Sequence, residues 1–488
     1  MIQAGVKYLF NCRATNSTRF FGGWLIIVMI GSMLMSGCAL TGFRPAPTLQ
    51  SKLEYAADSL LIPFESMGAS VAISVKTIEG ESVFSHDERR LMVPASIQKL
   101  AVAADALYSL PEDFHWETRI FGTGFMDSSG ILHGDLAIVG SWDPSLSGDR
   151  AYTQEPLTHF RAWVEILVAQ GLRQINGNLV IVGKTFTPGG WELGDISERY
   201  APVISQLSWN DGLVVVPMGL GTHPLARTNP RQEFWTVDHL KSRLVNKAQE
   251  HKKAVSSQYP VADPRILAGD AFRQVLRKKG IKGANYTKVT TEIPFNITLG
   301  SLGLTHRSAQ IDSVVKAMLG VSSNLWAEMV SATVEDYRGQ DAKYNPGWQK
   351  TLSRMGVSGE VANNADACGM ARRNNLSAYI ITDLLIKAND KWGQRWVDLL
   401  PKPGQKYSTL ETRLTDVSTN VRAKTGRMSR TRSLAGYILQ DEKPDLVFCV
   451  IFNNCPEAPD NSIDEFIRAL VRTNKYHYQL EAGYAVQR

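Results

Sequence analysis

A serine and a lysine three residues apart, Ser96 and Lys99, form the first pattern in this sequence that could do chemistry. On a helix this spacing places the hydroxyl and the amine on one face, within hydrogen-bond reach. There an uncharged Lys99 can accept the hydroxyl proton and turn Ser96 into a nucleophile. The pattern is weak by itself, because average composition gives about two such matches in a chain of this length. A helix cap beside a surface lysine is the alternative interpretation.

Two later groups of residues support the chemical interpretation. Ser322-Ser323-Asn324 precedes the apolar segment 325–334, which predicts a helix, and Lys424-Thr425-Gly426 leads into the strand-like segment 434–438. A K-T-G tripeptide alone arises by chance in about one chain in ten, and the three groups in this order are much rarer. The trio resembles the serine β-lactamases and penicillin-binding proteins, in which S-x-x-K, S-D-N and K-T-G groups occur together. We therefore expect the three groups to share one site.

Such a site gives each hydroxyl and amine a task. We expect Ser96, in the first turn of a helix, to present its Oγ to a carbonyl while its backbone N–H forms half of an oxyanion hole. Burial and the neighbouring charge of Lys424 should lower the pKa of Lys99. Ser322 can pass the proton to the leaving amine, and Asn324 can orient both Lys99 and a substrate amide.

The K-T-G segment is expected to hold the substrate. Lys424 and Thr425 offer a charge and a hydroxyl to a terminal carboxylate. Gly426 lets the substrate backbone lie close to the strand. The backbone N–H of Arg427 is the expected second donor of the oxyanion hole.

The spacing of these motifs narrows the resemblance to one family. Ser322 lies 226 residues after Ser96, which is far longer than in class A β-lactamases. It is similar to the class C low-molecular-mass penicillin-binding proteins, the DacB-type D-alanyl-D-alanine carboxypeptidase/endopeptidases. Further segments similar to that family lie at 134–136, 143–146, 200–202, 208–211, 263–264 and 280–281. The resemblance implies an α+β fold, in which a serine β-lactamase/transpeptidase-like domain of antiparallel sheet and helices carries β-rich inserted domains.

The same resemblance implies a function and its ligands. Such proteins hydrolyse the D-Ala-D-Ala and D-Ala-diaminopimelate bonds of peptidoglycan stem peptides through an acyl-enzyme, here on Ser96, and β-lactams inhibit them at the same serine. Asp195, in the loop 191–195, matches the family aspartate that contacts the diaminopimelate amine; an ordinary turn carboxylate is the alternative. For Arg372 two interpretations stay open, binding of the stem's carboxylate and a structural salt bridge.

The stretch 366–374 departs from the usual family pattern, D-G-S-G-L-S-R-x-N. Ala367, Cys368 and Ala371 replace small polar or glycine positions, and Arg427-Met428 follows the K-T-G where a small residue and leucine are usual. These changes leave open whether the substrate cleft is narrower and the turnover of substrate slower than with the usual family pattern. They motivate one alternative function, a peptidoglycan-binding lipoprotein with little catalysis. A β-lactamase is a further alternative, which the long insertion disfavours.

Hydrophobic periodicity places the motifs on elements. A helix over 50–62 precedes a strand hairpin at 71–84, and another helix begins at Ser96 and ends before Pro111. Short apolar runs between Gly, Pro and Asp turns then indicate a β-rich insertion. Helical patterns return from Ile311, and strands over 433–439 and 446–452 and an amphipathic helix over 463–471 close the chain. We therefore expect one transpeptidase-like domain built from 49–115 and 301–488 and interrupted at 116–300.

The first forty residues indicate export. The apolar segment 20–34 follows three isolated cations and is typical of a signal peptide rather than a membrane span. Met35-Ser36-Gly37-Cys38 resembles the bacterial lipoprotein cleavage signal, so we expect removal of 1–37, a lipid anchor on Cys38 and a tether over 38–48. An uncleaved anchor with an unmodified Cys38 is the alternative. Because Ala39 is not acidic, we expect a periplasm-facing lipoprotein of the outer membrane in a Gram-negative cell.

Composition excludes several classes of function. The 488 residues include 53 basic and 47 acidic side chains, and this net charge of +6 is too small to indicate nucleic-acid binding. Ligand spacings typical of zinc sites do not occur, so no metal or cofactor is expected.

Cys449 and Cys455 could pair in an oxidising compartment, with buried inert thiols as the default. The sequence leaves the oligomeric state open.

Overall fold

The computed structural model describes residues 48–146, 157–192, 199–218, 255–293, 302–340, 347–357 and 363–486. Residues Thr48–Arg488 belong to one structural unit. The predicted signal peptide and Cys38 therefore lie outside the described residues, as do Asp195 and most of the predicted tether. Within the described ranges, no helix has both the length and the apolar character that crossing a membrane requires.

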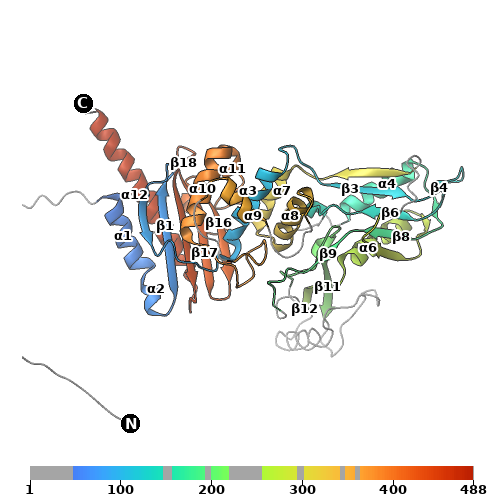
Figure 1. The fold of residues 1–488 in the computed structure, drawn as a ribbon, viewed down its shortest axis with the longest axis horizontal. Helices are drawn as coiled ribbons and strands as arrows, with labels where there is room; N and C mark the ends of the chain where they lie inside the picture. Colours follow the sequence, from blue (N-terminus) through green and yellow to red (C-terminus); the bar gives the residue numbers. More distant parts are fainter. Residues whose placement is uncertain are drawn as a thin grey trace, which may run out of the picture. The chain divides into compact units, whose positions relative to one another are not determined.

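A five-stranded antiparallel sheet joins the two ends of the chain (Figure 1). Its strands, in spatial order, are β16 (Val421–Met428), β17 (Thr431–Gln440), β18 (Lys443–Asn453), β1 (Ser70–Thr77) and β2 (Ser82–His86). The central strand β18 pairs with β17 on one side and with β1 on the other, where Cys449 lies opposite Ser74. The hairpin predicted at 71–84 and the two late strands therefore form one sheet, to which both ends of the described chain contribute.

Side chains of β18 alternate between the two faces of this sheet. Leu446, Phe448, Val450 and Phe452 pack on one face, in a cluster with residues of the first and last helices, α1 (Leu49–Leu60) and α12 (Asp460–Val486). Val447, Cys449 and Ile451 pack on the other face, in the larger cluster that contains the active-site helices. A strand that is apolar at every position is expected where both faces of a sheet are covered.

Four helices pack on the second face: α3 (Lys99–Ser109), α7 (Ile311–Val321), α8 (Asn324–Tyr337) and α10 (Ala378–Trp392). The motif residues Lys99 and Asn324 lie on α3 and α8, and Ser322 follows α7. Helix α3 is buried from Lys99 to Leu107, and it packs against α7, α8 and α9 (Trp348–Arg354). Its alanines at 101, 103, 104 and 106 are all fully buried. A helix that is apolar on every side is buried on every side, so α3 forms the centre of the domain.

A second five-stranded sheet lies in the segment predicted as an insertion. Its spatial order is β14 (Thr287–Thr290), β8 (Leu179–Val182), β6 (Leu136–Val139), β3 (Glu117–Gly122) and β15 (Gly303–Arg307). Helices α4 (Thr158–Ala169) and α6 (Pro264–Lys278) pack with this sheet around Trp163 and Phe272. Strand β15 pairs with β3, with Gly303 opposite Phe121. The edge strand β15 therefore extends this sheet past residue 300, the predicted end of the insertion.

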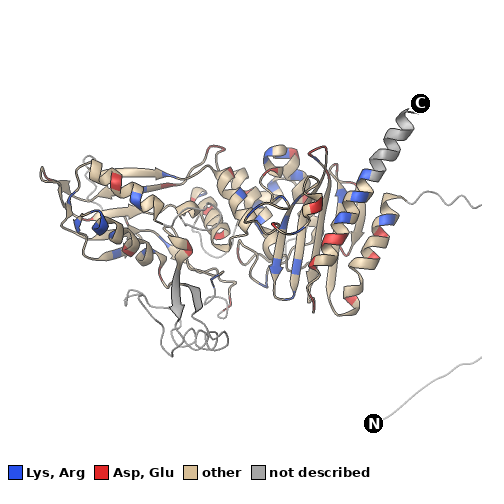
Figure 2. Cartoon of the chain, turned by 180° about the vertical axis from the view of Figure 1, so that it is seen from behind, with Lys and Arg blue, Asp and Glu red and all other residues tan. Residues whose placement is uncertain are grey.

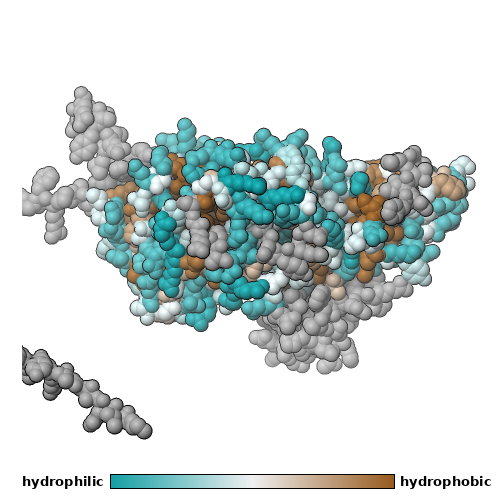
Figure 3. Space-filling model, in the orientation of Figure 1, coloured by the Kyte–Doolittle hydropathy of each residue, from teal (hydrophilic) through white to brown (hydrophobic). Residues whose placement is uncertain are grey.

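Short elements complete the described chain. They are α2 (Pro63–Ser66), β4 (Phe125–Met126), β5 (Ile131–His133), β7 (Gln174–Ile175), β9 (Thr185–Phe186), β10 (Ile204–Ser205), β11 (Leu213–Met218), β12 (Val255–Pro260), β13 (Lys282–Gly283) and α11 (Gln394–Val397), with 3-10 turns η1 (Ala95–Gln98), η2 (Pro144–Leu146), η3 (Asn210–Gly212) and η4 (Thr415–Val417). Acidic and basic residues are interspersed along the elements seen in Figure 2. Figure 3 shows hydrophilic side chains over most of the described surface on the face in view. Mixed charge of this kind is typical of an ordinary solvated surface.

Candidate active site

Ser96 lies on a strained turn at the start of the buried helix. The helix predicted to begin at Ser96 starts as the 3-10 turn η1 (Ala95–Gln98), and α-helical geometry begins at Lys99. Ala95 has a φ of 51°, in the left-handed region that non-glycine residues rarely adopt. The carbonyl of Pro94, the residue before Ala95, accepts a hydrogen bond of 2.7 Å from Ser433 Oγ on β17. The turn that presents Ser96 is therefore tied to the sheet.

Lys99 is fully buried and surrounded by three polar groups. Its Nζ lies 2.8 Å from Ser96 Oγ, 2.8 Å from Asn324 Oδ1 and 2.7 Å from the carbonyl oxygen of Cys368. Burial lowers the pKa of the Lys99 amine below its ordinary value, because the charged form loses its hydration. The S-x-x-K and S-x-N motifs, more than 200 residues apart in the chain, thus meet at one amine.

A second buried amine lies in the same site. Lys424 Nζ, on β16, donates to Ser322 Oγ at 2.8 Å and to the carbonyl of Thr425 at 2.7 Å. Ser322 caps α7 in the left-handed conformation, with φ 60°. Burial lowers the pKa of Lys424 well below its ordinary value, and repulsion by Lys99 lowers it further. Burial lowers the pKa of both amines, and the predicted effect of Lys424 on Lys99 stays a prediction.

Gly426 brings strand β16 against the nucleophile's backbone. A Cβ at this position would lie 2.0 Å from Ser433 Oγ and 3.1 Å from the backbone nitrogen of Ser96. Only glycine fits at such a distance. The adjacent Thr425 donates its hydroxyl to Thr409 Oγ1 at 2.7 Å. The K-T-G segment therefore borders the N–H of Ser96, as an oxyanion hole shared between them requires.

A cavity of about 590 Å³ opens onto these groups. Among the predicted site residues, those that line it are Ser96, Ser322, Asn324, Thr425, Arg427 and Arg372. The inserted segment lines it as well, through Gly190, Glu192, Arg199 and Tyr200. The carbonyl of Tyr200 accepts a hydrogen bond of 3.0 Å from Asn324 Nδ2. Both parts of the chain therefore form the cavity wall.

Two predicted substrate-binding residues have different outcomes. Asp195 lies outside the described residues, three positions after Glu192, which is described and lines the cavity. Arg372 is exposed at the cavity, and its Nη1 donates to the carbonyl of Ser429 at 3.5 Å. No carboxylate among the described residues forms an ion pair with Arg372, so the structure gives no support to the structural salt bridge.

Asp366 fixes the loop that carries the Cys368 carbonyl. Its carboxylate accepts hydrogen bonds from the backbone N–H groups of Gly369 (2.8 Å) and Ala371 (2.6 Å). It also accepts from Asn374 Nδ2 at 2.8 Å and from Trp191 Nε1 at 3.1 Å. Trp191 belongs to the loop predicted to hold substrate, and here it joins the inserted segment to the active-site loop.

Glu328 is a site residue that the sequence analysis missed. It is 3% exposed on α8, one turn after Asn324. Its Oε1 accepts from the N–H groups of Ala367 (2.9 Å) and Cys368 (2.8 Å). Burial, and next the charge of Asp366, raise the pKa of Glu328 to about 8. The only sequence signal was an acid within an otherwise apolar helical segment.

The three departures from the family pattern within 366–371 do not line the cavity, whereas Arg427 and Met428, the two departures after the K-T-G, do. Ala367, Cys368 and Ala371 are at most 2% exposed and do not line it, whereas their neighbours Gly369 and Met370 do. Cys368, Cys449 and Cys455 are all free and buried, so the predicted alternative of a Cys449–Cys455 disulfide is not formed. Burial raises the pKa of the Cys368 thiol well above its ordinary value, which makes it a poor thiolate nucleophile or metal ligand.

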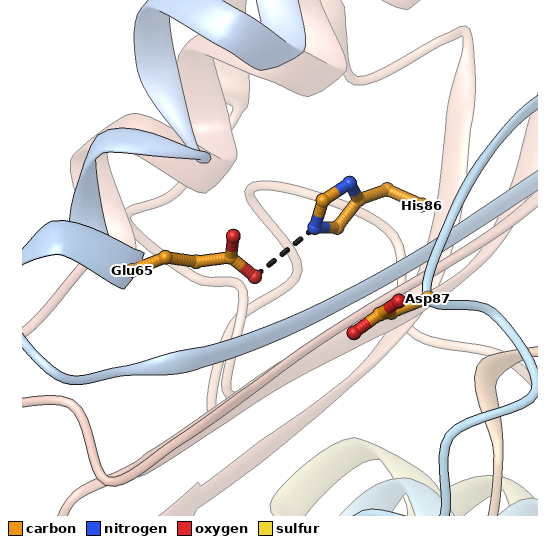
Figure 4. Close-up of side chains that lie close together, drawn as sticks. All are labelled: Glu65, His86 and Asp87. Atoms are coloured by element: carbon orange, nitrogen blue, oxygen red, sulfur yellow. Dashed lines mark hydrogen bonds and ion pairs between the residues drawn. The ribbon is translucent and has the colours of Figure 1, made fainter. Parts of the chain in front are cut away.

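Two groups of side chains in the described part of the chain could offer three ligand atoms to a metal ion. In the first, shown in Figure 4, His86 Nε2 lies 3.0 Å from Glu65 Oε1, and the carboxylate of Asp87 is paired with Arg90. The second group, Glu328, Asp366 and Cys368, is the set that anchors the loop described above. In both groups hydrogen bonds or ion pairs already use the ligand atoms, and neither group supplies a metal to Ser96.

The fold and this site define a class of protein. A serine hydroxyl beside a buried lysine amine, on a helix packed against an antiparallel sheet, is the arrangement of a serine peptidase that uses lysine as its base. The model of the D-Ala-D-Ala carboxypeptidase 3 (S13) family matches residues 53–473, and the chain belongs to this family.

Two relatives agree with this membership, and a solved structure has a similar fold. The chain is 25% identical over 433 residues to a D-alanyl-D-alanine carboxypeptidase of Actinomadura sp. (strain R39), covering 79% of this chain and 77% of that protein. It is 22% identical over 427 residues to D-alanyl-D-alanine carboxypeptidase DacB of Haemophilus influenzae, covering 79% and 86%. The fold is similar to that of penicillin binding protein 4 (dacB) from Haemophilus influenzae, with a TM-score of 0.65 at 18% identity over 88% of this chain and 99% of that one.

Proposed function

We propose that this serine peptidase is a DD-carboxypeptidase and DD-endopeptidase of peptidoglycan. It hydrolyses the D-Ala-D-Ala and D-Ala-diaminopimelate bonds of stem peptides through an acyl-enzyme on Ser96. The observation that supports this most strongly is the 2.8 Å distance between Lys99 Nζ and Ser96 Oγ. The names of the relatives from Actinomadura and Haemophilus support the carboxypeptidase part of the proposal.

The surroundings of Lys99 suit a neutral amine. A neutral amine has two N–H donors and one lone pair, and the Nζ has three polar neighbours. Asn324 Oδ1 and the Cys368 carbonyl are acceptors only, so they take the two N–H groups. The lone pair then faces Ser96, whose hydroxyl can donate. Lys99 is in this way oriented to remove the Ser96 proton during attack on the substrate carbonyl.

The remaining groups complete the acyl transfer. As Ser96 Oγ bonds to the carbonyl carbon, the oxygen becomes negative and is stabilised by the N–H groups of Ser96 and Arg427. Ser322, bonded to Lys424 Nζ at 2.8 Å, relays the proton that Lys99 took up to the departing amine, so that Lys99 is neutral again. Water, activated by Lys99, then attacks the ester and releases the shortened stem peptide. A β-lactam acylates the same serine and inhibits the enzyme.

Substrate contacts follow from the walls of the cavity. Thr425 and Lys424 bind the carboxylate of the leaving residue, and the approach of that carboxylate favours the charged form of Lys424. Arg372 binds a carboxylate of the stem, because it is exposed at the cavity and has no ion-pair partner among the described residues. Asp195 remains our candidate for the diaminopimelate amine, supported by the position of its neighbour Glu192 in the cavity wall.

We also propose that the protein works outside the cytoplasm. The sequence supports an exported, periplasm-facing lipoprotein anchored through Cys38, with the outer membrane as the expected site. Stem peptides of peptidoglycan are then the physiological partner. Globomycin treatment of cells, which blocks lipoprotein signal cleavage, tests the anchor: the unprocessed precursor should accumulate, and a Cys38→Ala protein should lose its lipid label.

The activity is tested by mass spectrometry of muropeptides before and after incubation with the mature protein. We expect loss of terminal alanine from pentapeptides and splitting of cross-linked dimers, and neither with Ser96→Ala. Turnover at the wild-type rate by Ser96→Ala would overturn the proposal. A wild type that binds muropeptides without converting them would instead favour the peptidoglycan-binding lipoprotein, and rapid release of hydrolysed penicillin would favour the β-lactamase.

A further inference from the structure

A second cavity, of about 580 Å³, lies on the same face of the sheet as Ser96. Three cations line it: Lys316 from α7, Lys402 from the segment after α11, and Arg422 from β16. The only acid in its wall is Asp398. No carboxylate in the described ranges lies within ion-pair distance of any of the three cations. A concave surface with a surplus of positive charge attracts anions.

Arg422 is the most constrained of these cations. It is half-buried, and its Nη1 donates to the backbone carbonyls of Ser418 (3.3 Å) and Val421 (3.0 Å). These two bonds hold the guanidinium in place, and no other atom of it forms a hydrogen bond within the described chain. Burial lowers the pKa of the Arg422 guanidinium, and the charges of Asp398 and Glu442 offset this effect only in part. Burial of a guanidinium is unfavourable unless an anion compensates it, and its remaining donors match the geometry of a carboxylate.

The position of this cavity relative to the active site follows from two elements that they share. Arg422 precedes Lys424 by two residues on β16, so both side chains point to the same face about 7 Å apart along the strand. Lys316 precedes Ser322 by six residues along α7, a rise of about 9 Å. The segment that follows α11 also borders both: Gln405 lines the cationic cavity and Thr409 lines the active-site cavity.

This order along β16 assigns the cavity to one side of the scissile bond. Gly426 lies beside the backbone of Ser96, and Lys424 and Thr425 follow as the proposed carboxylate site of the leaving residue. Arg422 lies beyond them. A single leaving alanine ends with the carboxylate that Lys424 and Thr425 bind, so it does not reach Arg422, about 7 Å further along the strand. A leaving group that is part of a second stem peptide is long enough to reach Arg422.

We propose that the cavity formed by Lys316, Lys402 and Arg422 binds carboxylates of the second stem peptide, the leaving one, when the enzyme cleaves a cross-linked dimer. The inference rests on the proposed endopeptidase function and specifies the subsite for its larger leaving group. Release of one alanine from a monomer does not involve the cavity. The three cations therefore set the preference for dimers over monomers.

Two variants and a control test this subsite in the mature protein. The double variant Lys316→Gln/Lys402→Gln removes the two exposed cations. The variant Arg422→Gln removes the third cation, the one that the double variant still has for binding a carboxylate. Lys278→Gln/Lys288→Gln removes two exposed cations of the inserted segment as the control. Each protein is given a pentapeptide monomer, a cross-linked dimer, and the same dimer with the carboxylates of its leaving stem amidated.

We expect the double variant to cleave the free-acid dimer with kcat/KM about tenfold lower than wild type, as loss of charge-assisted hydrogen bonds predicts. Its rate on the monomer should stay within about twofold of wild type by the same reasoning. The kcat/KM of wild type should fall by a similar factor when the leaving stem is amidated, and the double variant should not distinguish the two dimers.

Equal losses of kcat/KM on monomer and dimer, or a double variant that still prefers the free-acid dimer as wild type does, would overturn the subsite. A wild type that cleaves the monomer but not the dimer overturns it too, whereas one inactive on all three contradicts the proposed function itself.

Discussion

Glu328 and Lys99 bind opposite ends of one residue, Cys368. The Cys368 N–H donates to Glu328 Oε1 at 2.8 Å, and the Cys368 carbonyl accepts from Lys99 Nζ at 2.7 Å. Glu328 also follows Asn324, another partner of Lys99, by one helical turn. A buried carboxyl that does not line the cavity therefore positions one of the three groups that surround the amine, the Cys368 carbonyl.

Removing the Glu328 carboxyl should loosen this loop. Glu328→Ala leaves the buried N–H groups of Ala367 and Cys368 without an acceptor, which costs about 1–3 kcal/mol for each group. Glu328→Gln keeps an amide oxygen at the same place and should retain most of the stability. Urea unfolding of both variants checks this. Equal stability of Glu328→Ala and wild type would show that the carboxyl does not hold the loop.

The stability of the protein should depend on pH through Glu328. Its folded pKa is about 8, above the ordinary value of 4.5. Between these values the folded state keeps the proton and the unfolded chain loses it, so this group lowers stability as pH rises from about 5 to 8. Glu328→Gln lacks this loss. The stability of Glu328→Gln minus that of wild type should therefore grow across this window, and a constant difference in thermal unfolding scans would contradict the raised pKa.

Loss of the Lys99 amine should slow acylation while penicillin still enters the cavity. Lys99→Met removes the proton acceptor, and general-base catalysis of this kind contributes about 10²–10⁴-fold. Because burial lowers the pKa of Lys99, the wild-type acylation rate should rise with pH and level off below 10.5, the ordinary lysine value. Stopped-flow acylation by a fluorescent penicillin measures both effects. An acylation rate that keeps rising past pH 10.5 would mean that the pKa of Lys99 is not lowered.

A methyl group at Gly426 should disturb both stability and acylation. The new Cβ would lie 2.0 Å from Ser433 Oγ, and overpacking of this kind costs about 1–3 kcal/mol. Gly426→Ala/Ser433→Ala removes this contact and should recover part of the stability. Gly320→Ala is the control, because its nearest neighbour, Gln405, would be 3.7 Å away. A Gly426→Ala protein that unfolds and acylates like wild type would show that β16 does not lie this close to Ser96.

The motifs could be predicted from the sequence because each is local. Ser96 and Lys99 need only a helical spacing, and the strands at 433–439 and 446–452 follow from apolar runs joined by a tight turn. Pairing of β1 with β18 could not be predicted, since nothing local in residues 70–77 specifies a partner at residues 446–453. The expectation that both ends of the chain form one domain came from elsewhere. The order of motifs and their resemblance to a family supplied that long-range information.

The supporting contacts of the site could not be predicted. The bond from Trp191 to Asp366 joins residues 175 positions apart, and it depends on how the inserted segment packs. Burial lowers the pKa of both Lys99 and Lys424, and burial is a property of the whole fold. The cations of the second cavity are likewise scattered at positions 316, 402 and 422, where each alone is an ordinary surface charge.

The activation of Ser96 by Lys99 is tested most directly by intact-protein mass spectrometry after brief exposure to benzylpenicillin, followed by peptide mapping. One penicilloyl group should appear on the peptide that contains Ser96. The modified fraction at a fixed short time should fall sharply in Lys99→Met and be absent in Ser96→Ala. An adduct on another residue, or equal labelling of Lys99→Met and wild type, would contradict the account.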